Sequence, residues 1–286
     1  MSDAEWAVVR DAMPVPGWLE GHGGQPESYC HRQMVDAVRY LVAGGITWRA
    51  MPADFPAWDR VYAFFRRWRD KGLVTEFHDR LRGRVREAAG RDPEPTAGII
   101  DAQSVKAAAS VPAATRGFDG GKKVNGRERR IVVDTLGLLL TVMVTAASVT
   151  DRDAGQTLLA RLSERHWRVT RVWADGGYTG RLVDFARGVL RVALTVVKRS
   201  DDTSGFTVLP KRWLVERTSA WLMHSRRPPG PVLPACRTET LTRGWRASAP
   251  SLVRQGRRVA RPVPRPPEHG GPRSAVQRSW PGRRCC

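Results

Sequence analysis

The chain has 286 residues, which is room for one or two domains, and a formal net charge of +20. That charge favours a polyanionic partner such as nucleic acid, although it is unevenly distributed along the sequence. Residues 226–286 hold 14 arginines, no lysine and two glutamates, which gives +12, whereas the first 225 residues carry only +8.

The same totals exclude several classes of protein. The four cysteines show neither zinc-ligand spacing nor a disulfide framework. The first residues are acidic and polar, unlike a signal peptide, and no apolar run approaches the roughly 20 residues of a membrane span. We therefore expect a cytoplasmic protein with no membrane partner.

An all-α domain is predicted for residues 1–92. Ser2 and Glu5 have the capping-box spacing for a first short helix, which Pro14 ends. Apolar residues at helical spacing predict three further helices, over about 29–43, 58–70 and 74–89.

The third of these four helices combines aromatic residues with arginines. A helix, a short connection and then such a helix suits a helix-turn-helix-like DNA-binding domain, in which Arg60, Arg66 and Arg67 would contact DNA. The alternative is a small helical bundle whose aromatic residues form the core and whose arginines are only solvated.

Residues 93–97 form a proline-broken linker, after which the pattern changes to strands. Five strands are predicted at 97–101, 128–134, 138–144, 169–174 and 192–197, with helices at 153–165, at 181–187 and from about 211. This order predicts an α+β or α/β fold with a mixed five-stranded sheet and flanking helices.

Residues 104–128 are expected to form a basic loop with several glycines. Its Lys122, Lys123 and Arg127 either contact phosphate or are merely solvated.

Three carboxylates stand out because of their settings. Asp101 and Asp175 each end an apolar run that reads as a strand, and Glu216 lies near the start of a predicted helix. A strand end is rigid, so it can fix a carboxylate oxygen where a hard divalent cation needs it. A pair of such cations can clamp the attacking and leaving oxygens of a phosphodiester displacement. Taken singly, each aspartate could instead only begin a turn.

Several segments resemble transposases of the bacterial insertion sequence five group, within the DDE, RNase H-like transposase superfamily. They are IDAQSVK at 100–106, GGKKVNGR at 120–127, VDTLG at 133–137, VWADGGY at 172–178 and RWLVERT at 212–218. Two upstream segments, WRAMP at 48–52 and YAFFRRW at 62–68, resemble the N-terminal domain of that group. The resemblance covers roughly residues 3–227.

The resemblance implies an RNase H-like DDE catalytic domain over residues 98–227. Asp101, Asp175 and Glu216 would be its catalytic, metal-binding triad, which would hold two Mg²⁺ (or Mn²⁺) ions. Members of the group hydrolyse a phosphodiester at the ends of the element, and the freed 3′-hydroxyl then attacks target DNA. Arg212, one helical turn before Glu216, would contact DNA phosphate.

The resemblance also implies partners and a location. The partners would be double-stranded DNA, as terminal inverted repeats and as target, and further copies of the chain in a homo-oligomer. The protein would be associated with the nucleoid in a bacterial cytoplasm.

The resemblance stops after residue 227. Residues 228–286 hold 11 of the 20 prolines and show no sustained periodicity, a composition typical of disorder. We hypothesise a frameshift near codon 228; reading the gene in its other two frames tests this, and finding no family-like helix there would refute it. The alternative is a genuine basic arm that binds DNA non-specifically.

Three functions compete at this stage. The chain is a DDE transposase that cuts and joins DNA, or a catalytically impaired DNA-binding remnant that acts as a repressor or has no activity, or a different nuclease on the same fold. The intact triad favours the first function, and the aberrant tail favours the second. The N-terminal helical domain disfavours a simple nuclease, which needs no module for recognising element ends.

Overall fold

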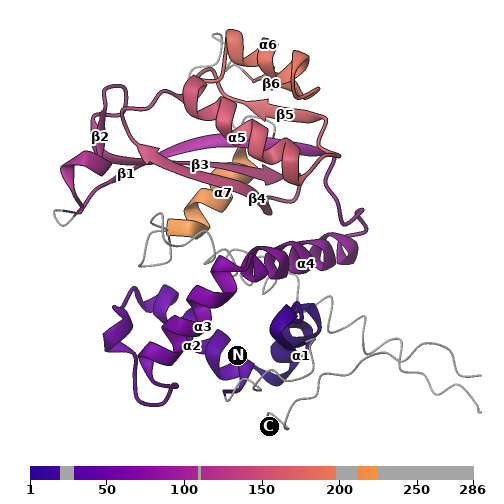
Figure 1. The fold of residues 1–286 in the computed structure, drawn as a ribbon. Helices are drawn as coiled ribbons and strands as arrows, with labels where there is room; N and C mark the ends of the chain where they lie inside the picture. Colours follow the sequence, from indigo (N-terminus) through magenta and orange to yellow (C-terminus); the bar gives the residue numbers. More distant parts are fainter. Residues whose placement is uncertain (20–28, 109–110, 198–210, 224–286) are drawn as a thin grey trace, which may run out of the picture.

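The computed structural model describes residues 1–19, 29–108, 111–197 and 211–223 (Figure 1). The α-helices are α1 (Asp3–Ala12), α2 (His31–Gly44), α3 (Trp58–Asp70), α4 (Leu73–Ala88), α5 (Asp151–Arg165), α6 (Arg181–Gly188) and α7 (Arg212–Met223). Short 3₁₀ helices are η1 (Gly17–Leu19), η2 (Trp48–Ala50) and η3 (Ala113–Thr115). The strands are β1 (Ala97–Lys106), β2 (Gly117–Asp119), β3 (Val124–Asp134), β4 (Leu139–Ala146), β5 (Arg171–Ala174) and β6 (Ala193–Val196). None of the described helices has the length and apolar character needed to cross a membrane.

The first four α-helices form an all-helical region, which confirms the prediction for this part of the sequence. The capping box of α1 is present, since the Ser2 hydroxyl accepts the Glu5 N–H at 3.2 Å and the Glu5 carboxylate accepts the Ser2 N–H at 2.8 Å. α3 buries Phe64, Phe65 and Trp68, so these three aromatic residues form core, whereas Trp58 at the start of the helix is exposed. This packing holds the helices together, because short isolated helices are marginal in water.

The helix-turn-helix likeness of this region stays a prediction. The connection between α2 and α3 spans residues 45–57 and contains η2, which is longer than the three or four residues typical of that motif. The predicted DNA contacts Arg60, Arg66 and Arg67 are all exposed on α3.

β1 is the central strand of one mixed sheet (Figure 1). β3 pairs with it antiparallel on one side, and β5 pairs with it parallel on the other. β4 continues the antiparallel side and β6 the parallel side, which gives the order β4-β3-β1-β5-β6. Three antiparallel strands followed by two parallel ones are the arrangement of an RNase H-like fold, as predicted.

The five predicted strands are confirmed, and a sixth was missed. β1 continues to Lys106 and β3 already begins at Val124, so much of the predicted loop at 104–128 is strand. Within it, β2 pairs with the first residues of β3, beside the end of β4. Such polar, glycine-rich strands lack the alternation of apolar residues by which a strand is recognised in a sequence. They are stabilised by pairing with the neighbouring strand.

Helices cover both faces of the sheet (Figure 1). Ile100 and Val132 share an apolar cluster with leucines of α5 and α6 on one face. Ile99 and Ile131 share another cluster with Val215 of α7 on the opposite face. Alternate residues of β1 therefore point to different helices, as the two-residue period of a strand requires.

A buried ion pair joins the helical region to the sheet. Arg86 of α4 donates to Asp134 at the end of β3, and the Asp134 side chain is fully buried. Asp134 also accepts the backbone N–H groups of Leu136 at 2.9 Å and Leu138 at 2.8 Å, which fixes the β3–β4 turn. Both leucines pack against the core of the helical region.

The same turn holds α7 on its other side. The Thr218 hydroxyl donates to the carbonyl of Gly137 at 2.7 Å, and Arg217 donates to the carbonyl of Leu136 at 2.8 Å. Gly137 has a φ of +80°, and a Cβ there would lie 2.8 Å from the Arg217 Nη2 atom. Glycine is therefore required here both for backbone conformation and for space.

Replacing Asp134 by Ala should lower the free energy of unfolding by about 3–5 kcal/mol, because it leaves Arg86 buried without its carboxylate and the turn without its acceptor. Urea unfolding of the purified chain measures the effect. Asp59→Ala is the matched control, since this exposed α3 aspartate pairs only loosely with Arg60 at 3.7 Å and should change stability by less than about 0.5 kcal/mol. Equal effects of the two substitutions would contradict the role given to Asp134.

Candidate active site

The three predicted carboxylates come from three elements that meet on one face of the sheet. Asp101 lies within β1, Asp175 directly follows β5, and Glu216 lies in the second turn of α7. Ile99 of β1 pairs with Trp173 of β5. Asp101 and Asp175 each lie two residues further along the two parallel strands, at matching positions. α7 packs across β1 and β3, which brings Glu216 to the same face.

The electrostatics of Asp101 record this proximity. Its pKa is raised to about 6, first because burial disfavours the charged form and then because the Asp175 and Glu216 carboxylates repel its charge. A hydrogen bond from the Ala102 backbone and the positive charge of Arg212 act in the opposite direction. The charges of Asp175 and Glu216 therefore both act on Asp101.

Arg212 lies between two of the acids. Its Nη2 atom is 4.0 Å from the Asp175 Oδ2 atom and 3.9 Å from the Glu216 Oε1 atom. These distances describe loose ion pairs without a direct hydrogen bond. The arginine and Glu216 are four residues apart on α7, the spacing that puts both side chains on one face of a helix.

The turn after β5 is crowded by a fourth carboxylate that the sequence analysis missed. The Gly177 N–H donates to the Asp175 Oδ1 atom at 2.9 Å. A Cβ on Gly177 would lie 2.6 Å from the Asp151 Oδ2 atom, at the start of α5, and 3.2 Å from that Asp175 oxygen. Asp151 is held in turn by the fully buried Arg130, whose Nε donates to it at 2.9 Å. The DGG motif was visible in sequence, but its neighbour 24 residues upstream was not.

The start of α7 is also fixed to β5. The Nζ atom of Lys211 lies 3.6 Å from the centre of the Trp173 ring, which is a cation–π contact. Lys211 adopts a φ of +72°, a conformation that non-glycine residues rarely take. This contact therefore positions the helix that carries Arg212 and Glu216 against the strand that leads to Asp175. No sequence pattern indicated this pairing.

The donor set has the chemistry of a divalent-cation site. Three carboxylates supply hard oxygen ligands, and Arg212 lies 4.0 Å from Asp175 and 3.9 Å from Glu216 without a direct hydrogen bond to either. Among the described residues, however, no three His, Cys, Asp or Glu side chains converge closely enough to ligate one ion. The side chains fit such an ion by their chemistry and would draw together around it.

The basic residues predicted around 104–128 have different surroundings. Lys122 pairs with Glu128 at 2.8 Å and with Asp119 at 3.7 Å. Arg127 donates to the Thr115 carbonyl at 3.1 Å and hydroxyl at 2.7 Å. Lys123 is exposed. To contact DNA, Lys122 and Arg127 would therefore have to give up these partners within the chain.

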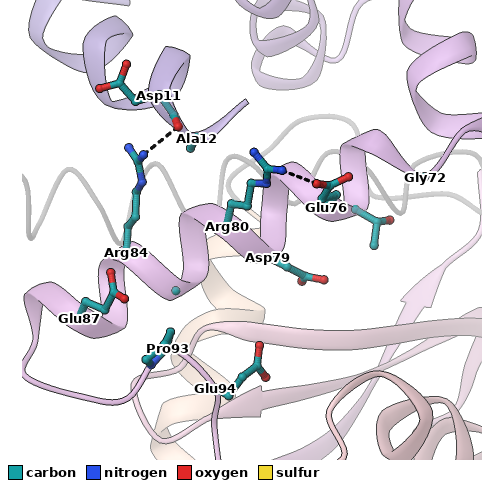
Figure 2. A pocket seen from close by; sticks show the side chains of 12 residues that line it. Asp11, Ala12, Gly72, Glu76, Asp79, Arg80, Arg84, Glu87, Pro93 and Glu94 are labelled. Carbon is teal, nitrogen blue, oxygen red and sulfur yellow. Dashed lines mark hydrogen bonds and ion pairs between the residues drawn. The ribbon is translucent and has the colours of Figure 1, made fainter. Parts of the chain in front are cut away.

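A cavity of about 640 Å³ lies away from the triad, between α1, α4 and the linker (Figure 2). Its acidic side chains are largely engaged within the chain. Glu76 accepts from Arg80 at 2.6 Å, and Asp79 accepts from Arg82 and from Arg165, each at 2.7 Å. This cavity therefore belongs to the packing of the helical region and is separate from the three carboxylates.

The raised pKa of Asp101 predicts how pH acts on stability. The folded chain keeps a proton on Asp101 up to about pH 6, whereas an ordinary aspartate loses it near 3.8, so stability falls as pH rises through this window. Asp101→Asn should therefore raise the free energy of unfolding of the metal-free chain by about 1–3 kcal/mol at pH 7.5 and have little effect near pH 4. Urea unfolding at both pH values measures this.

Asp184→Asn, on the exposed side of α6, is the control and should change stability little at either pH. An Asp101→Asn effect of the same size at pH 4 and pH 7.5 would contradict the electrostatic account.

Two family models match the chain. The model described as transposase of IS4/5 family (DUF4096) matches residues 1–78, and the model described as transposase DDE domain matches residues 92–227. A comparison with curated proteins gave no match.

Several solved structures are similar at low identity. The piggyBac transposase synaptic complex with hairpin DNA is 9% identical with a TM-score of 0.44, over 88% of this chain and 72% of that one. The Mos1 strand transfer complex is 13% identical with a TM-score of 0.33, over 84% and 80%. A chain of the simian T-cell lymphotropic virus intasome, solved in complex with a PP2A regulatory subunit, is 14% identical with a TM-score of 0.33, over 64% of this chain and 61% of its own length.

These structural likenesses are weak, so the assignment rests on the two sequence matches. The first covers α1 to α3 and the start of α4, and the second covers the sheet with α7, in the order expected of one protein. The chain belongs to the DDE transposases of the IS4/5 type.

Proposed function

We propose that this transposase cleaves a phosphodiester at the ends of its insertion element and joins the freed 3′-hydroxyl to target DNA. The observation that supports the proposal is the placement of Asp101, Asp175 and Glu216 on one face of the sheet, with Arg212 within 4.0 Å of both Asp175 and Glu216. The exposure of Arg60, Arg66 and Arg67 on α3 supports DNA binding by the same chain.

We infer that the three carboxylates hold divalent cations, as DDE transposases generally do. Mg²⁺ is the natural candidate and Mn²⁺ a substitute, with two ions per site. Such ions supply Lewis-acid polarisation of the phosphoryl oxygens and neutralise the charge that develops there. Asp101 must be ionised to ligate a cation, so the affinity for the metal cation should fall below about pH 6.

The remaining residues would orient the DNA. Arg212 is loosely paired with both Asp175 and Glu216, so it can turn to a phosphate when cations take over the balancing of those acids. Lys122 and Lys123, between β2 and β3, and Arg127 of β3 are further candidates for phosphate contacts. The proposed partners are double-stranded DNA, as terminal repeats and as target, and further copies of the chain.

A second candidate function is a catalytically impaired DNA-binding remnant. The match to the transposase DDE domain ends at residue 227, where the composition changes to proline and arginine. The predicted disorder and frameshift fall at 228–286, outside the residues that the structure describes. The described part of α7 ends at Met223, four residues before the match to the DDE domain stops. Loss of the packing partners that normally follow α7 would therefore weaken the position of Glu216.

Cleavage of duplex DNA that carries the element's flanking repeats separates the two functions. With Mg²⁺, the natural chain should cut the DNA, and Asp175→Asn should abolish cutting while leaving binding largely intact, because it removes a ligand charge without removing the side chain. Binding by both proteins without cutting by either would favour the remnant. A parallel loss of binding and cutting in the variant would refute the assignment of Asp175.

Two adjacent glycines give a matched test of the site's geometry. Gly177→Ala puts a Cβ 2.6 Å from Asp151, which Arg130 holds in place, so Asp175 is displaced, whereas at Gly176 nothing lies within 4 Å of the new atom. The rate of DNA cleavage should fall roughly 10- to 100-fold for Gly177→Ala and stay near the natural rate for Gly176→Ala. Equal rates would show that the turn does not set the position of Asp175.

A further inference from the structure

One buried arginine differs from all the others that the structure describes. Four arginines are buried, namely Arg82, Arg86, Arg129 and Arg130. Three of them pair with a carboxylate: Arg82 with Asp79 at 2.7 Å, Arg86 with Asp134, and Arg130 with Asp151 at 2.9 Å. Within the described residues, Arg129 has no carboxylate partner, and its one hydrogen bond is from Nη2 to the side-chain oxygen of Gln103.

The unpaired state of Arg129 is unusual for a buried charge. Its side chain is 3% exposed, yet Nε and Nη1 have no hydrogen-bond partner in the part of the chain that the structure describes. Burial lowers its pKa to about 10, so the guanidinium still carries its charge at neutral pH. A buried charge is normally paired, because removing it from water without a partner is costly. Among the residues that the structure describes, no anion balances this charge.

The position of Arg129 in the sheet shows where such an anion would bind. Arg129 pairs with Gln103 across β3 and β1, and Ile131 pairs with Asp101 two residues along. Residues two apart on a strand share a face, so Arg129 lies on the same face as Asp101, about 7 Å further along the sheet. α7 extends the other way, toward the turn at 136–137, through its hydrogen bonds there. Arg129 is thus the buried cation of the face on which the triad lies.

We propose that Arg129, oriented by Gln103, binds a phosphate group of the DNA strand that enters the active site. The inference rests on the proposed function, and it adds a phosphate site one step along the sheet from Asp101. A guanidinium presents several N–H donors in a fixed plane that matches phosphate oxygens, and such charge-assisted bonds are strongest where water is excluded. The guanidinium is already withdrawn from water, so a DNA strand that reaches it on this face would supply the anion that the described residues do not.

Two measurements on the full chain test this without requiring catalysis. The first is the rise in melting temperature that inorganic phosphate produces in metal-free buffer. The second is the salt dependence of binding to duplex DNA, where loss of one phosphate contact lowers the slope by about one. Arg129→Gln should lose most of the phosphate-induced rise and show the smaller slope, and Arg129→Lys should keep part of both.

Arg152→Gln is the matched control, because it removes one charge from an exposed position on α5, which covers the opposite face. It should keep the phosphate-induced rise and the slope of the natural chain. Arg129→Met tests whether the arginine serves folding instead. Removing an unpaired buried charge should raise the melting temperature in phosphate-free buffer, as expected where stability is sacrificed for function.

Two results would overturn the inference. One is an Arg129→Gln chain with the natural phosphate response and salt slope. The other is an Arg129→Met chain that melts well below the natural protein, which would make Arg129 a structural residue. If the phosphate response depends on Arg129 but no metal-dependent cleavage is found, the phosphate site stands and the proposed function fails. If the chain cleaves DNA but Arg129 contributes to neither measurement, the proposed function stands and the phosphate site fails.

Discussion

The register of β1 is the constraint on which the candidate site depends. Because alternate residues of a strand face opposite sides, a shift of one residue in its pairing with β3 would send Asp101 to the side of α5, away from Glu216. That register is secured by apolar residues on both faces, with Ile99 in the cluster under α7 and Ile100 in the cluster under α5. The parallel pairing of β1 with β5 then brings Asp175 beside Asp101. The position of the carboxylates is thus a consequence of core packing.

Glu216, the third acid, is positioned by contacts of α7 with the β3–β4 turn. Asp134 organises this turn through the backbone and pairs with Arg86 of the helical region, while Thr218 and Arg217 of α7 donate to its carbonyls. Lys211 fixes the start of α7 on Trp173. The helix that carries Glu216 is therefore held at two points, at its start by the strand before Asp175 and at its middle by the turn that meets the helical region. Displacement at either point moves Glu216 relative to the other two acids.

Sequence patterns predicted what local physics determines, and missed what distant partners determine. The capping box at Ser2, the apolar faces of α2–α4 and the strands that lead to Asp101 and Asp175 were all readable, since each depends on residues close in the chain. The prediction that Asp101 ends its strand was wrong, because β1 continues beside β3 to Lys106. β2 was hidden because polar, glycine-rich segments become strands only beside an existing edge. Asp151 beside Gly177 and the lone charge of Arg129 were equally hidden, because burial and pairing are properties of residues brought together by the sheet.

The most direct measurement is the affinity for Mn²⁺, measured by titration of the natural chain and of Asp101→Asn, Asp175→Asn and Glu216→Gln. Each substitution removes one ligand charge from a different element, so convergence of the three acids on one metal site predicts that each lowers the affinity at least roughly tenfold. The folded state of every variant is checked by its unfolding midpoint. A variant that stays folded and binds Mn²⁺ as tightly as the natural chain would show that its residue lies outside the metal site, and would contradict the account.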